Sequence, residues 1–345
     1  MTQPRILIIG AFGQIGRDLT IALNKKFKQD NVLIADIHTK CPDELSNNKY
    51  IRLNVLDTEQ LKAVLLQHKI NEVYLLADLP FAENTHQKNA SWQLNVHALI
   101  GVLELAHKLR LNKVFWPSSI AVFGPDSPKY HCSQYARIEP LTAYGISKRA
   151  GEYWCNYYAE KYGVDVRSLR YPGLMSHNFT PGRCATDYAS EMFHAAVEGR
   201  RYDCYLSEDN CLPMMYIDDA IDATIQLMEA PKDQITTRLS YNVAAASFAP
   251  CDLAAIIRKY LPGFKVNYQP DRRDVIAKSW PSSINDQQAR ADWGWRYQFD
   301  LDKIAREMVV KLAAKKKIEL RTDTIAQLAY PDFPMDNYVY STRHI

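Results

Sequence analysis

The stretch "ILIIGAFGQIGRDL", residues 6–19, decides the predicted fold. Its first four residues form an apolar run typical of a strand that is buried on both faces. This run is followed by Gly10, Gly13 and Gly16 and then by an amphipathic helical pattern. Three glycines at this spacing permit a tight turn, a close approach of backbone N–H groups to a diphosphate, and close packing of the helix on the strand. The stretch therefore predicts the opening strand, loop and helix of a doubly wound α/β fold that binds a dinucleotide.

Apolar runs and helical patterns alternate along the first half of the chain, which is typical of β-α-β units on a parallel sheet. The predicted strands span residues 5–9, 32–36, 50–53, 72–76, 113–117 and 166–170. The predicted helices between them span residues 14–28, 58–69, 90–109 and 144–162. The second half predicts a helix near 187–199, then mixed short elements, and a last helix near 301–314.

We therefore expect an α/β protein with a doubly wound parallel sheet (a Rossmann fold) and a smaller α/β substrate-binding domain. The dinucleotide-binding domain is expected over residues 1–171, and the substrate-binding domain over 172–314, with some of its segments returning to the large sheet. Residues 315–345 are expected to form an extended tail over the surface or over a partner subunit.

Composition and charge exclude several classes of protein. The 345 residues are 47% hydrophobic, which is enough for a full core, and no apolar run reaches membrane-spanning length. A net charge of +3 without long charged runs predicts neither a nucleic acid nor a membrane as a partner. The seven cysteines are irregularly spaced, so we expect reduced thiols, no metal site and a cytoplasmic location.

A carboxylate at the end of the second predicted strand indicates which dinucleotide is bound. Asp36 follows Gly16 by twenty residues, where it can accept hydrogen bonds from both hydroxyls of an adenosine ribose. Its charge would repel a 2′-phosphate, and the next four residues, 37–40, contain no arginine. We therefore predict that the cofactor is NAD rather than NADP. The alternative is a turn with packing glycines and a strand-end aspartate.

The segment "TAYGISKRAGEYW", residues 142–154, places Tyr144 and Lys148 on one face of a predicted helix. A phenol has an ordinary pKa near 10, and a nearby ammonium lowers that pKa, so such a pair can remove a hydroxyl proton. The alternative is two large side chains that share a helical face. Ser118 and Ser119 favour the functional interpretation, because they lie at the carboxyl end of a predicted strand, where ligands bind in open α/β sheets.

Taken together, the glycine pattern, Asp36, "SSIAVFG", "YGISK" and "RYPG" resemble the extended short-chain dehydrogenase/reductase family. The resemblance implies Ser119, Tyr144 and Lys148 as the catalytic set. In that family the tyrosine is the acid/base, the lysine lowers its pKa and holds the nicotinamide ribose, and the serine bonds the reacting oxygen. Asn95 matches the helix asparagine that shapes the active site in the family.

Later segments narrow the resemblance. "LPMMYIDDAI", "SYNVAA" and "SWPSSINDQQARADWGW" are similar to the NAD-dependent L-threonine 3-dehydrogenases of this superfamily, and the match covers about residues 4 to 310. Sugar-nucleotide enzymes would show an asparagine where this chain has Pro172-Gly173-Leu174. The resemblance implies oxidation of the 3-hydroxyl of L-threonine, or of a close β-hydroxy amino acid, to 2-amino-3-ketobutyrate without a metal.

The expected binding residues follow from these patterns and from the resemblance. The cofactor-binding set comprises Gly10, Gly13, Gln14, Ile15, Gly16, Asp36, Asn54, Val55, Leu76, Ala77, Asn95, Tyr144, Lys148 and Tyr171. The substrate-binding set comprises Ser118, Ser119, Tyr144, Arg183 and Thr186. Thr186 has an alternative role, because Thr-Asp at 186–187 is equally typical of an N-cap with an acidic first turn.

Two substrate-facing stretches depart from the resembled pattern. "LADLPFAENTH" has Phe81 in place of a serine and Asp78 where a small residue is expected. A glycine triplet is replaced by Gly182-Arg183-Cys184, which restricts the loop. Arg183 can clamp a carboxylate, and Asp78 can meet an ammonium. The reaction class is thus predicted more firmly than the substrate.

Two questions stay open at the level of sequence. The helices at 90–109 and 144–162 resemble those of a four-helix dimer interface, so a homodimer is expected, although their apolar positions fit an intramolecular core equally well. The alternative functions are a nucleotide-sugar epimerase or dehydratase of the same fold, and a non-catalytic NAD-binding protein.

Overall fold

The computed structural model describes residues 3–79, 85–178, 184–320, 324–325 and 328. Its centre is a seven-stranded sheet of order β10-β6-β5-β4-β1-β2-β3, in which every pair of neighbouring strands is parallel. The strands are β1 (Ile6–Ile9), β2 (Val32–Asp36), β3 (Tyr50–Arg52), β4 (Glu72–Leu75), β5 (Lys113–Ser119), β6 (Val166–Tyr171) and β10 (Tyr241–Asn242). The order of strands reverses between β1 and β4, so the predicted doubly wound sheet is confirmed.

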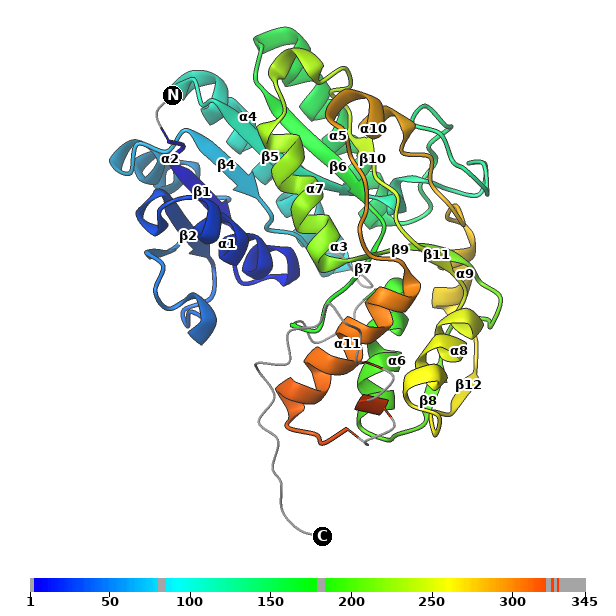
Figure 1. Cartoon of the computed structure of the whole chain (residues 1–345). Helices are drawn as coiled ribbons and strands as arrows, with labels where there is room; N and C mark the ends of the chain where they lie inside the picture. The colour runs from blue at the N-terminus through cyan, green and yellow to red at the C-terminus, as the bar shows by residue number, and fades with distance from the viewer. Residues whose placement is uncertain (1–2, 80–84, 179–183, 321–323, 326–327, 329–345) are drawn as a thin grey trace.

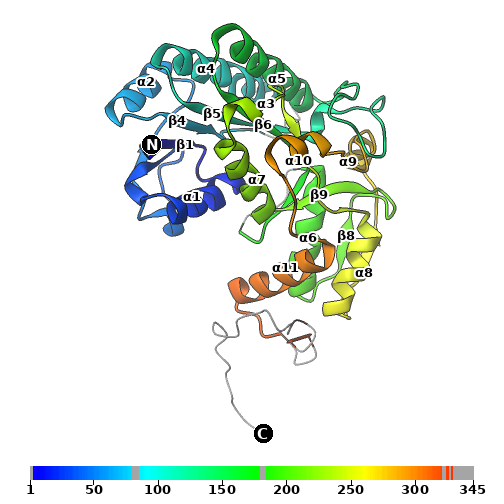
Figure 2. The same cartoon turned by 45° about the horizontal axis from the view of Figure 1, so that its top comes forward.

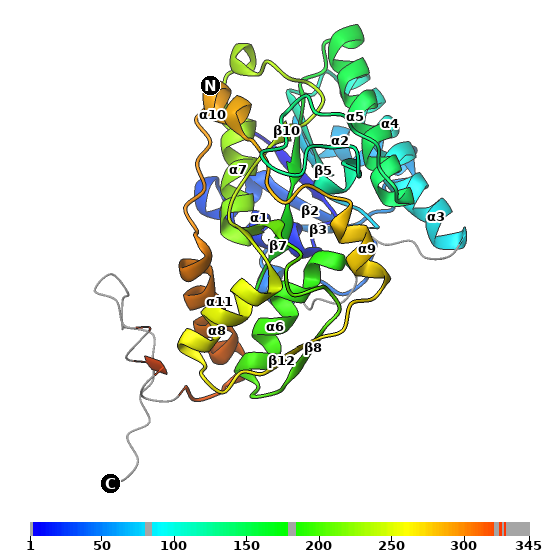
Figure 3. The ribbon, with the colours of Figure 1, turned by 90° about the vertical axis from the view of Figure 1, so that its right-hand side faces the viewer.

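Helices cover both faces of this sheet (Figure 1). Seen from the side, α4 and α5 lie on one face and α1 and α7 on the other (Figure 3). The two layers consist of α2 (Thr58–Gln67), α4 (Ala98–Leu109) and α5 (Ala143–Tyr162), and of α1 (Gln14–Lys26) and α7 (Ile217–Glu229). Successive residues of β1 therefore belong to different apolar clusters, Ile6 and Ile8 to one and Leu7 and Ile9 to the other.

The predicted helix at 90–109 is three helical segments in succession. These are α3 (Thr85–Trp92), a π-helical turn (Gln93–His97) and α4. A π turn inserts one residue into the helical ladder and is common at functional sites. Here it contains Asn95, which the resemblance had assigned to the active site.

The smaller region lies below the large sheet in Figure 2 and contains two short sheets. Its strands are β7 (Gly173–Met175), β9 (Leu212–Tyr216) and β11 (Ser247–Phe248) in one sheet, and β8 (Tyr202–Cys204) and β12 (Val266–Tyr268) in the other. Its helices are α6 (Tyr188–Val197), α8 (Pro250–Tyr260), α9 (Arg272–Lys278) and α11 (Leu301–Lys316), of which α6, α8 and α11 pack together. The helix α10 (Gln287–Trp293) instead packs on β10 of the large sheet (Figure 1).

The chain beyond residue 171 returns to the large sheet. Strand β10 pairs with β6 at its edge, and α7 packs on β6 and α1. The expected domain division at residue 171 stays a prediction. Most of the tail expected at 315–345 lies outside the described residues. Over the part of the chain that the structure describes, no helix is both long enough and apolar enough to cross a bilayer.

Candidate active site

A cleft of about 800 Å³ lies at the carboxyl ends of β1, β4, β5 and β6. This is the point where the strand order reverses, the usual ligand position in an open parallel sheet. The glycine-rich loop forms one wall, the first turn of α5 another, and the turn before α6 together with α9 a third. A volume of this size accommodates an extended organic ligand.

The glycine-rich loop is shaped for close backbone contact. Gly10 has a φ of 84°, and a Cβ there would lie 2.5 Å from the backbone nitrogen of Ala77. A Cβ on Gly16 would lie 2.4 Å from the carbonyl oxygen of Gly10, so only glycine fits at either position. No side chain caps α1 at Gly13, which leaves its first backbone N–H groups facing the cleft for an anion.

Asp36 joins this loop to the second strand. Its carboxylate is almost fully buried, and Oδ2 accepts a hydrogen bond from the backbone N–H of Phe12 at 3.0 Å. Oδ1 accepts from the backbone N–H of His38 at 3.2 Å and lies 2.6 Å from the His38 ring nitrogen Nδ1. The open helix end, the glycine cradle and this carboxylate fit a diphosphate and an unphosphorylated ribose, the two parts of NAD that the sequence predicted here.

The residues expected around the cofactor divide into two groups. Nine of them line the cleft: Gly10, Gly13, Gln14, Ile15, Gly16, Leu76, Tyr144, Lys148 and Tyr171. Five do not line it in this structure: Asp36, Asn54, Val55, Ala77 and Asn95. Val55 is packed in the apolar core, and the Asn54 side chain accepts from the backbone N–H of Leu56 at 3.1 Å. Their cofactor roles stay predictions.

Asn95 acts on the site through a neighbouring helix. Its Nδ2 donates to the hydroxyl of Ser147 at 3.0 Å and to that of Ser91 at 3.3 Å. Ser147 in turn donates to the backbone carbonyl of Tyr144 at 2.7 Å. The π turn is thereby fixed to the first turn of α5, which holds Tyr144 in place.

Helix α5 approaches β5 closely at its N-terminus. Thr142 caps the helix by accepting from the backbone N–H of Gly145 at 3.0 Å. A Cβ on Gly145 would lie 2.1 Å from the carbonyl oxygen of Ala121, and one on Gly151 would lie 2.3 Å from the ring of Trp116. These two glycines let α5 sit against β5, so that Tyr144 lies within hydrogen-bonding reach of Ser119.

Tyr144 and Lys148 share a third partner, Asp78, which follows β4. The Tyr144 hydroxyl donates to Asp78 Oδ2 at 3.0 Å, and Lys148 Nζ lies 3.0 Å from the same oxygen. Lys148 is 1% exposed and also donates to the backbone carbonyl of Pro117 at 2.8 Å. The three ionisable side chains therefore form one connected group in the cleft wall.

This group reverses the pKa shift that the sequence predicted for Tyr144. Burial raises the pKa of the Tyr144 phenol well above its usual value, and the charges of Asp78 and Cys184 raise it further. A hydrogen bond with Ser119 opposes them but does not prevail. Lys148 is paired with Asp78, and its expected lowering of this pKa stays a prediction.

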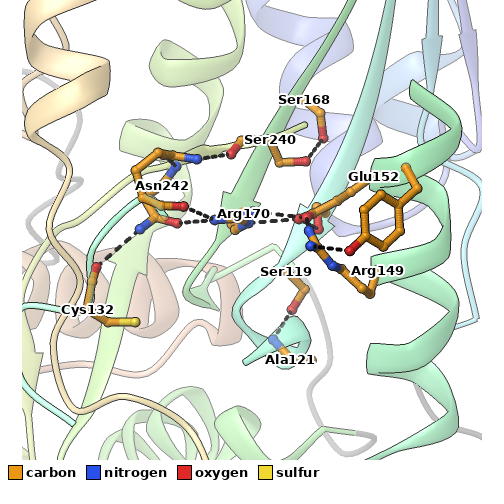
Figure 4. A network of polar contacts seen from close by, with 12 residues as sticks. Ser119, Ala121, Cys132, Arg149, Glu152, Ser168, Arg170, Ser240 and Asn242 are labelled. Atoms are coloured by element: carbon orange, nitrogen blue, oxygen red, sulfur yellow. Dashed lines mark hydrogen bonds and ion pairs between the residues drawn. The ribbon is translucent and has the colours of Figure 1, made fainter. Parts of the chain in front are cut away.

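A buried ionic network lies behind the cleft (Figure 4). Arg170 of β6 and Glu152 of α5 are 1% and 0% exposed, and they form two hydrogen bonds of 2.8 and 3.0 Å. Arg149 adds a contact of 2.9 Å, and Arg170 also donates to Asn242 of β10 at 3.0 Å. Although burial raises the pKa of Glu152, the charge and hydrogen bonds of Arg170 hold it below its usual value.

The hydroxyl of Ser118 belongs to this network. It donates to Glu152 Oε1 at 2.8 Å, and Ser118 is buried, although it borders the cleft. Neighbouring residues of a strand point to opposite faces, so Ser118 turns toward Glu152 in the interior of α5, whereas Ser119 turns into the cleft, within reach of Tyr144 at the start of α5. This contact differs from the substrate-orienting role expected for Ser118, which stays a prediction. Sequence patterns gave no sign of the pairing of Glu152 with Arg170.

The substrate side of the cleft is built around Thr186. It lines the cleft in a short turn (Ala185–Asp187), and α6 begins only at Tyr188, so Thr186 is not the N-cap of that helix. A Cβ on Gly173 would lie 2.8 Å from the Cβ of Thr186, which explains why this position after β6 is a glycine. Arg272, Ile276 and Trp280 also line the cleft and were not predicted, whereas Arg183 and Phe81 lie outside the described residues.

Comparisons with known proteins agree with this geometry. A model of the NAD-dependent epimerase/dehydratase family matches residues 6–244. The mitochondrial L-threonine 3-dehydrogenase of Bos taurus is 39% identical over 310 residues, which cover 89% of this chain and 82% of the relative.

Two solved structures are similar over nearly the whole chain. The holo form of a GalE-like L-threonine dehydrogenase from Cupriavidus necator is 48% identical with a TM-score of 0.85, covering 90% of this chain and 100% of that chain. A monomeric L-threonine 3-dehydrogenase from a metagenome is 40% identical with a TM-score of 0.85, covering 91% and 100%. The resemblance predicted from the sequence motifs is confirmed.

Proposed function

The chain belongs to the NAD-dependent epimerase/dehydratase family, and we propose that it is an NAD-dependent L-threonine 3-dehydrogenase. The reaction is oxidation of the 3-hydroxyl of L-threonine, or of a close β-hydroxy amino acid, to 2-amino-3-ketobutyrate. The observation that carries the proposal is the meeting of Tyr144, Lys148 and Ser119 in the cleft at the carboxyl ends of the central strands. The similarity to L-threonine dehydrogenases over about nine tenths of the chain supports the choice of substrate.

Each end of the cleft has a group suited to part of the cofactor. The open N-terminus of α1 and the glycine loop would hold the diphosphate, and Asp36 would accept from the adenosine ribose. Lys148 would hold the nicotinamide ribose. When bound, NAD supplies the hydride acceptor. The backbone N–H of Phe12 in the glycine loop donates to Asp36, and this contact between the loop and the end of β2 supports the proposed cofactor position.

Tyr144 and Ser119 would act on the substrate hydroxyl. When Tyr144 is in its deprotonated phenolate form, it takes the O–H proton as the C3–H bond breaks, its electron pair leaves as hydride and the C–O bond becomes a carbonyl. Ser119 hydrogen-bonds the same oxygen and keeps it beside Tyr144. Ser118, Thr186 and Arg183 are proposed to orient the amino and carboxylate groups of the substrate, and Ser118 and Thr186 line the cleft.

We test the function by mixing purified protein with NAD and measuring NADH formation with L-threonine, L-allo-threonine, serine, 3-hydroxynorvaline and nucleotide sugars. L-threonine or a close analogue should give the fastest reaction, and Tyr144→Phe should lower kcat by about 100-fold or more. Tyr157→Phe, an exposed tyrosine on the same helix, is the matched control. Equal rates for wild type and Tyr144→Phe would refute the mechanism. Conversion of a nucleotide sugar would identify an epimerase or dehydratase, and NAD binding without turnover would identify a non-catalytic protein.

We also propose a cytoplasmic homodimer that pairs through α4 and α5. Four large aromatic side chains of α5 are between 36% and 56% exposed: Tyr153, Trp154, Tyr157 and Tyr162. Of these, Tyr157 contacts both Trp154 and Tyr162. Large exposed aromatics in one row are typical of protein interfaces. Because one similar enzyme is described as monomeric, light scattering of wild type and Trp154→Glu is the test. A monomeric wild type would contradict the proposal.

A further inference from the structure

Over the part of the chain that the structure describes, the side chain of Asp78 is bonded to the two members of the proposed catalytic pair, Tyr144 and Lys148. Its Oδ2 accepts from both the Tyr144 hydroxyl and the Lys148 ammonium, each at 3.0 Å. Its Oδ1 is buried and has no hydrogen-bond partner among the residues that the structure describes. Both oxygens of the buried Glu152, by contrast, are bonded. The bonds of Asp78 thus go to both members of the proposed catalytic pair through one oxygen.

The shared oxygen fixes where the protons are. Because a carboxylate oxygen only accepts, the proton of the Tyr144–Asp78 hydrogen bond belongs to Tyr144. Ionising Tyr144 would place two negative charges about 3.0 Å apart. The ammonium that would stabilise a phenolate already compensates Asp78.

Other groups face Tyr144 from each neighbouring element. Ser119 approaches from β5 as a neutral hydrogen-bond partner, Cys184 approaches from the turn before α6, and Lys148 belongs to α5 itself. The remaining ionisable groups among the described residues of the cleft are His38, Tyr171, Asp187 and Arg272. Of the neighbouring groups that raise the pKa of Tyr144, Asp78 has the largest effect.

We propose that Asp78 is a positioning residue that holds Tyr144 in its neutral, proton-donating form. It thereby shifts oxidation of the alcohol to higher pH and keeps reduction of the carbonyl active at neutral pH. This inference rests on the proposed function, in which Tyr144 exchanges the proton of the substrate oxygen. The small residue that the resemblance expects at this position would exert no such effect, so Asp78 distinguishes this chain from that pattern.

The first test is the pH dependence of kcat/KM for oxidation in wild type, Asp78→Asn and Asp78→Ala. Removing the negative charge should move the acid limb of the profile to lower pH by at least one unit. Even in the dielectric of bulk water, a unit charge 3.0 Å from an ionising group shifts the pKa of that group by about one unit. On that limb the variants should react about tenfold faster than wild type. The exposed Asp30→Asn, with the same change in net charge, is the control and should leave the profile unchanged.

The second test needs no substrate. The chain has 21 tyrosines, and when they are replaced by 3-fluorotyrosine, the ¹⁹F signal of Tyr144 can be assigned by its loss in Tyr144→Phe. Its titration should move to lower pH in Asp78→Asn. Unchanged titration and an unchanged acid limb would overturn the inference. An acid limb that moves to higher pH, or a loss of kcat/KM at every pH without a shift, would also overturn it and would instead assign Asp78 to proton acceptance or to the substrate ammonium.

The two tests separate the inference from the function on which it rests. If no β-hydroxy amino acid is oxidised by wild type but the Tyr144 titration shifts as expected, the proposed function fails and the control of Tyr144 by Asp78 stands. If oxidation and the Tyr144→Phe loss are both observed while the titration does not shift, the function stands and the inference fails.

Discussion

Replacing Glu152 by alanine should destabilise the protein more than any surface substitution on α5. Glu152 is fully buried, and its two oxygens receive hydrogen bonds from Arg170 at 2.8 and 3.0 Å, from Arg149 at 2.9 Å and from Ser118 at 2.8 Å. Removal of the carboxylate leaves the 1% exposed guanidinium of Arg170 without its main counter-charge. The two partners lie on α5 and β6, so the loss weakens the contact between a helix and the central sheet.

The size of the effect follows from burial rather than from the number of contacts. Breaking a buried ion pair by removing one partner costs about 3–5 kcal/mol, because the remaining charge stays buried without compensation. Removing both charges together is far less costly, since replacing a buried ion pair by apolar side chains often leaves the free energy of unfolding unchanged. We therefore expect about 3–5 kcal/mol for Glu152→Ala and a clearly smaller loss for the double variant Glu152→Met with Arg170→Met.

Urea unfolding of the NAD-free protein, followed by far-ultraviolet circular dichroism, measures these free energies of unfolding. Glu160→Ala, an exposed glutamate on the same helix, is the matched control and should change stability by less than about 0.5 kcal/mol. A loss below about 1 kcal/mol for Glu152→Ala, or a double variant as unstable as the sum of its singles, would refute the reasoning.

Three other substitutions test the cofactor site and the region beneath it. Gly16→Ala should abolish NAD binding measured by calorimetry, because its Cβ would lie 2.4 Å from the Gly10 carbonyl oxygen, whereas Gly263→Ala, where nothing lies within 4 Å, should bind normally. Asp36→Ala should raise the Kd for NAD about tenfold or more, since hydrogen bonds to a charged group contribute roughly 1.5–3 kcal/mol. The variant should also show a smaller preference for NAD over NADP, and an unchanged Kd for NAD would contradict the contact of Asp36 with the ribose. Burial and the charges of Lys311 and Lys315 lower the pKa of His177 to about 4, so the unfolded chain binds this proton at a higher pH than the folded chain, and stability should fall as pH drops from about 6.5 to 4. His177→Gln should lessen that fall when melting temperature is measured against pH. An equal loss of melting temperature with pH in wild type and variant would argue against this role.

The central sheet was predictable because its strands β1, β2, β4, β5 and β6 are almost entirely buried. Each of the six predicted strands appears within two residues of its expected bounds, since a continuous apolar run between turn residues has no other stable position in a layered α/β fold. Strand β10 was missed because it has only two residues, Tyr241 and Asn242. Helix α7 was missed because β9 ends at Tyr216 and the helix begins at Ile217, with no turn residue to separate the two patterns.

The candidate site was predictable only as far as spacing within one element determines it. The four-residue interval places Tyr144 and Lys148 on one helical face whatever surrounds them. The pairing of Lys148 with Asp78 depends on how α5 packs beside the end of β4, and no pattern within either segment contains that information. The same holds for Glu152 and Arg170. Charged residues are rarely fully buried unless they are paired, so a sequence pattern alone predicts both side chains to be exposed.

The positions at which the chain departs from the family pattern are not independent of one another. Asp78 follows β4 and Cys184 precedes α6, yet both face the Tyr144 phenol, and the charge of Asp78 raises its pKa. Two departures from the resembled pattern in distant segments thus meet beside one oxygen. If these departures only adapted the pocket to a different substrate side chain, they would not need to lie beside the Tyr144 oxygen, because substrate binding and proton transfer are separate requirements. The convergence favours a chain in which the protonation of Tyr144, and with it the preferred direction and pH of the reaction, differs from that of a site with only the Tyr–Lys pair.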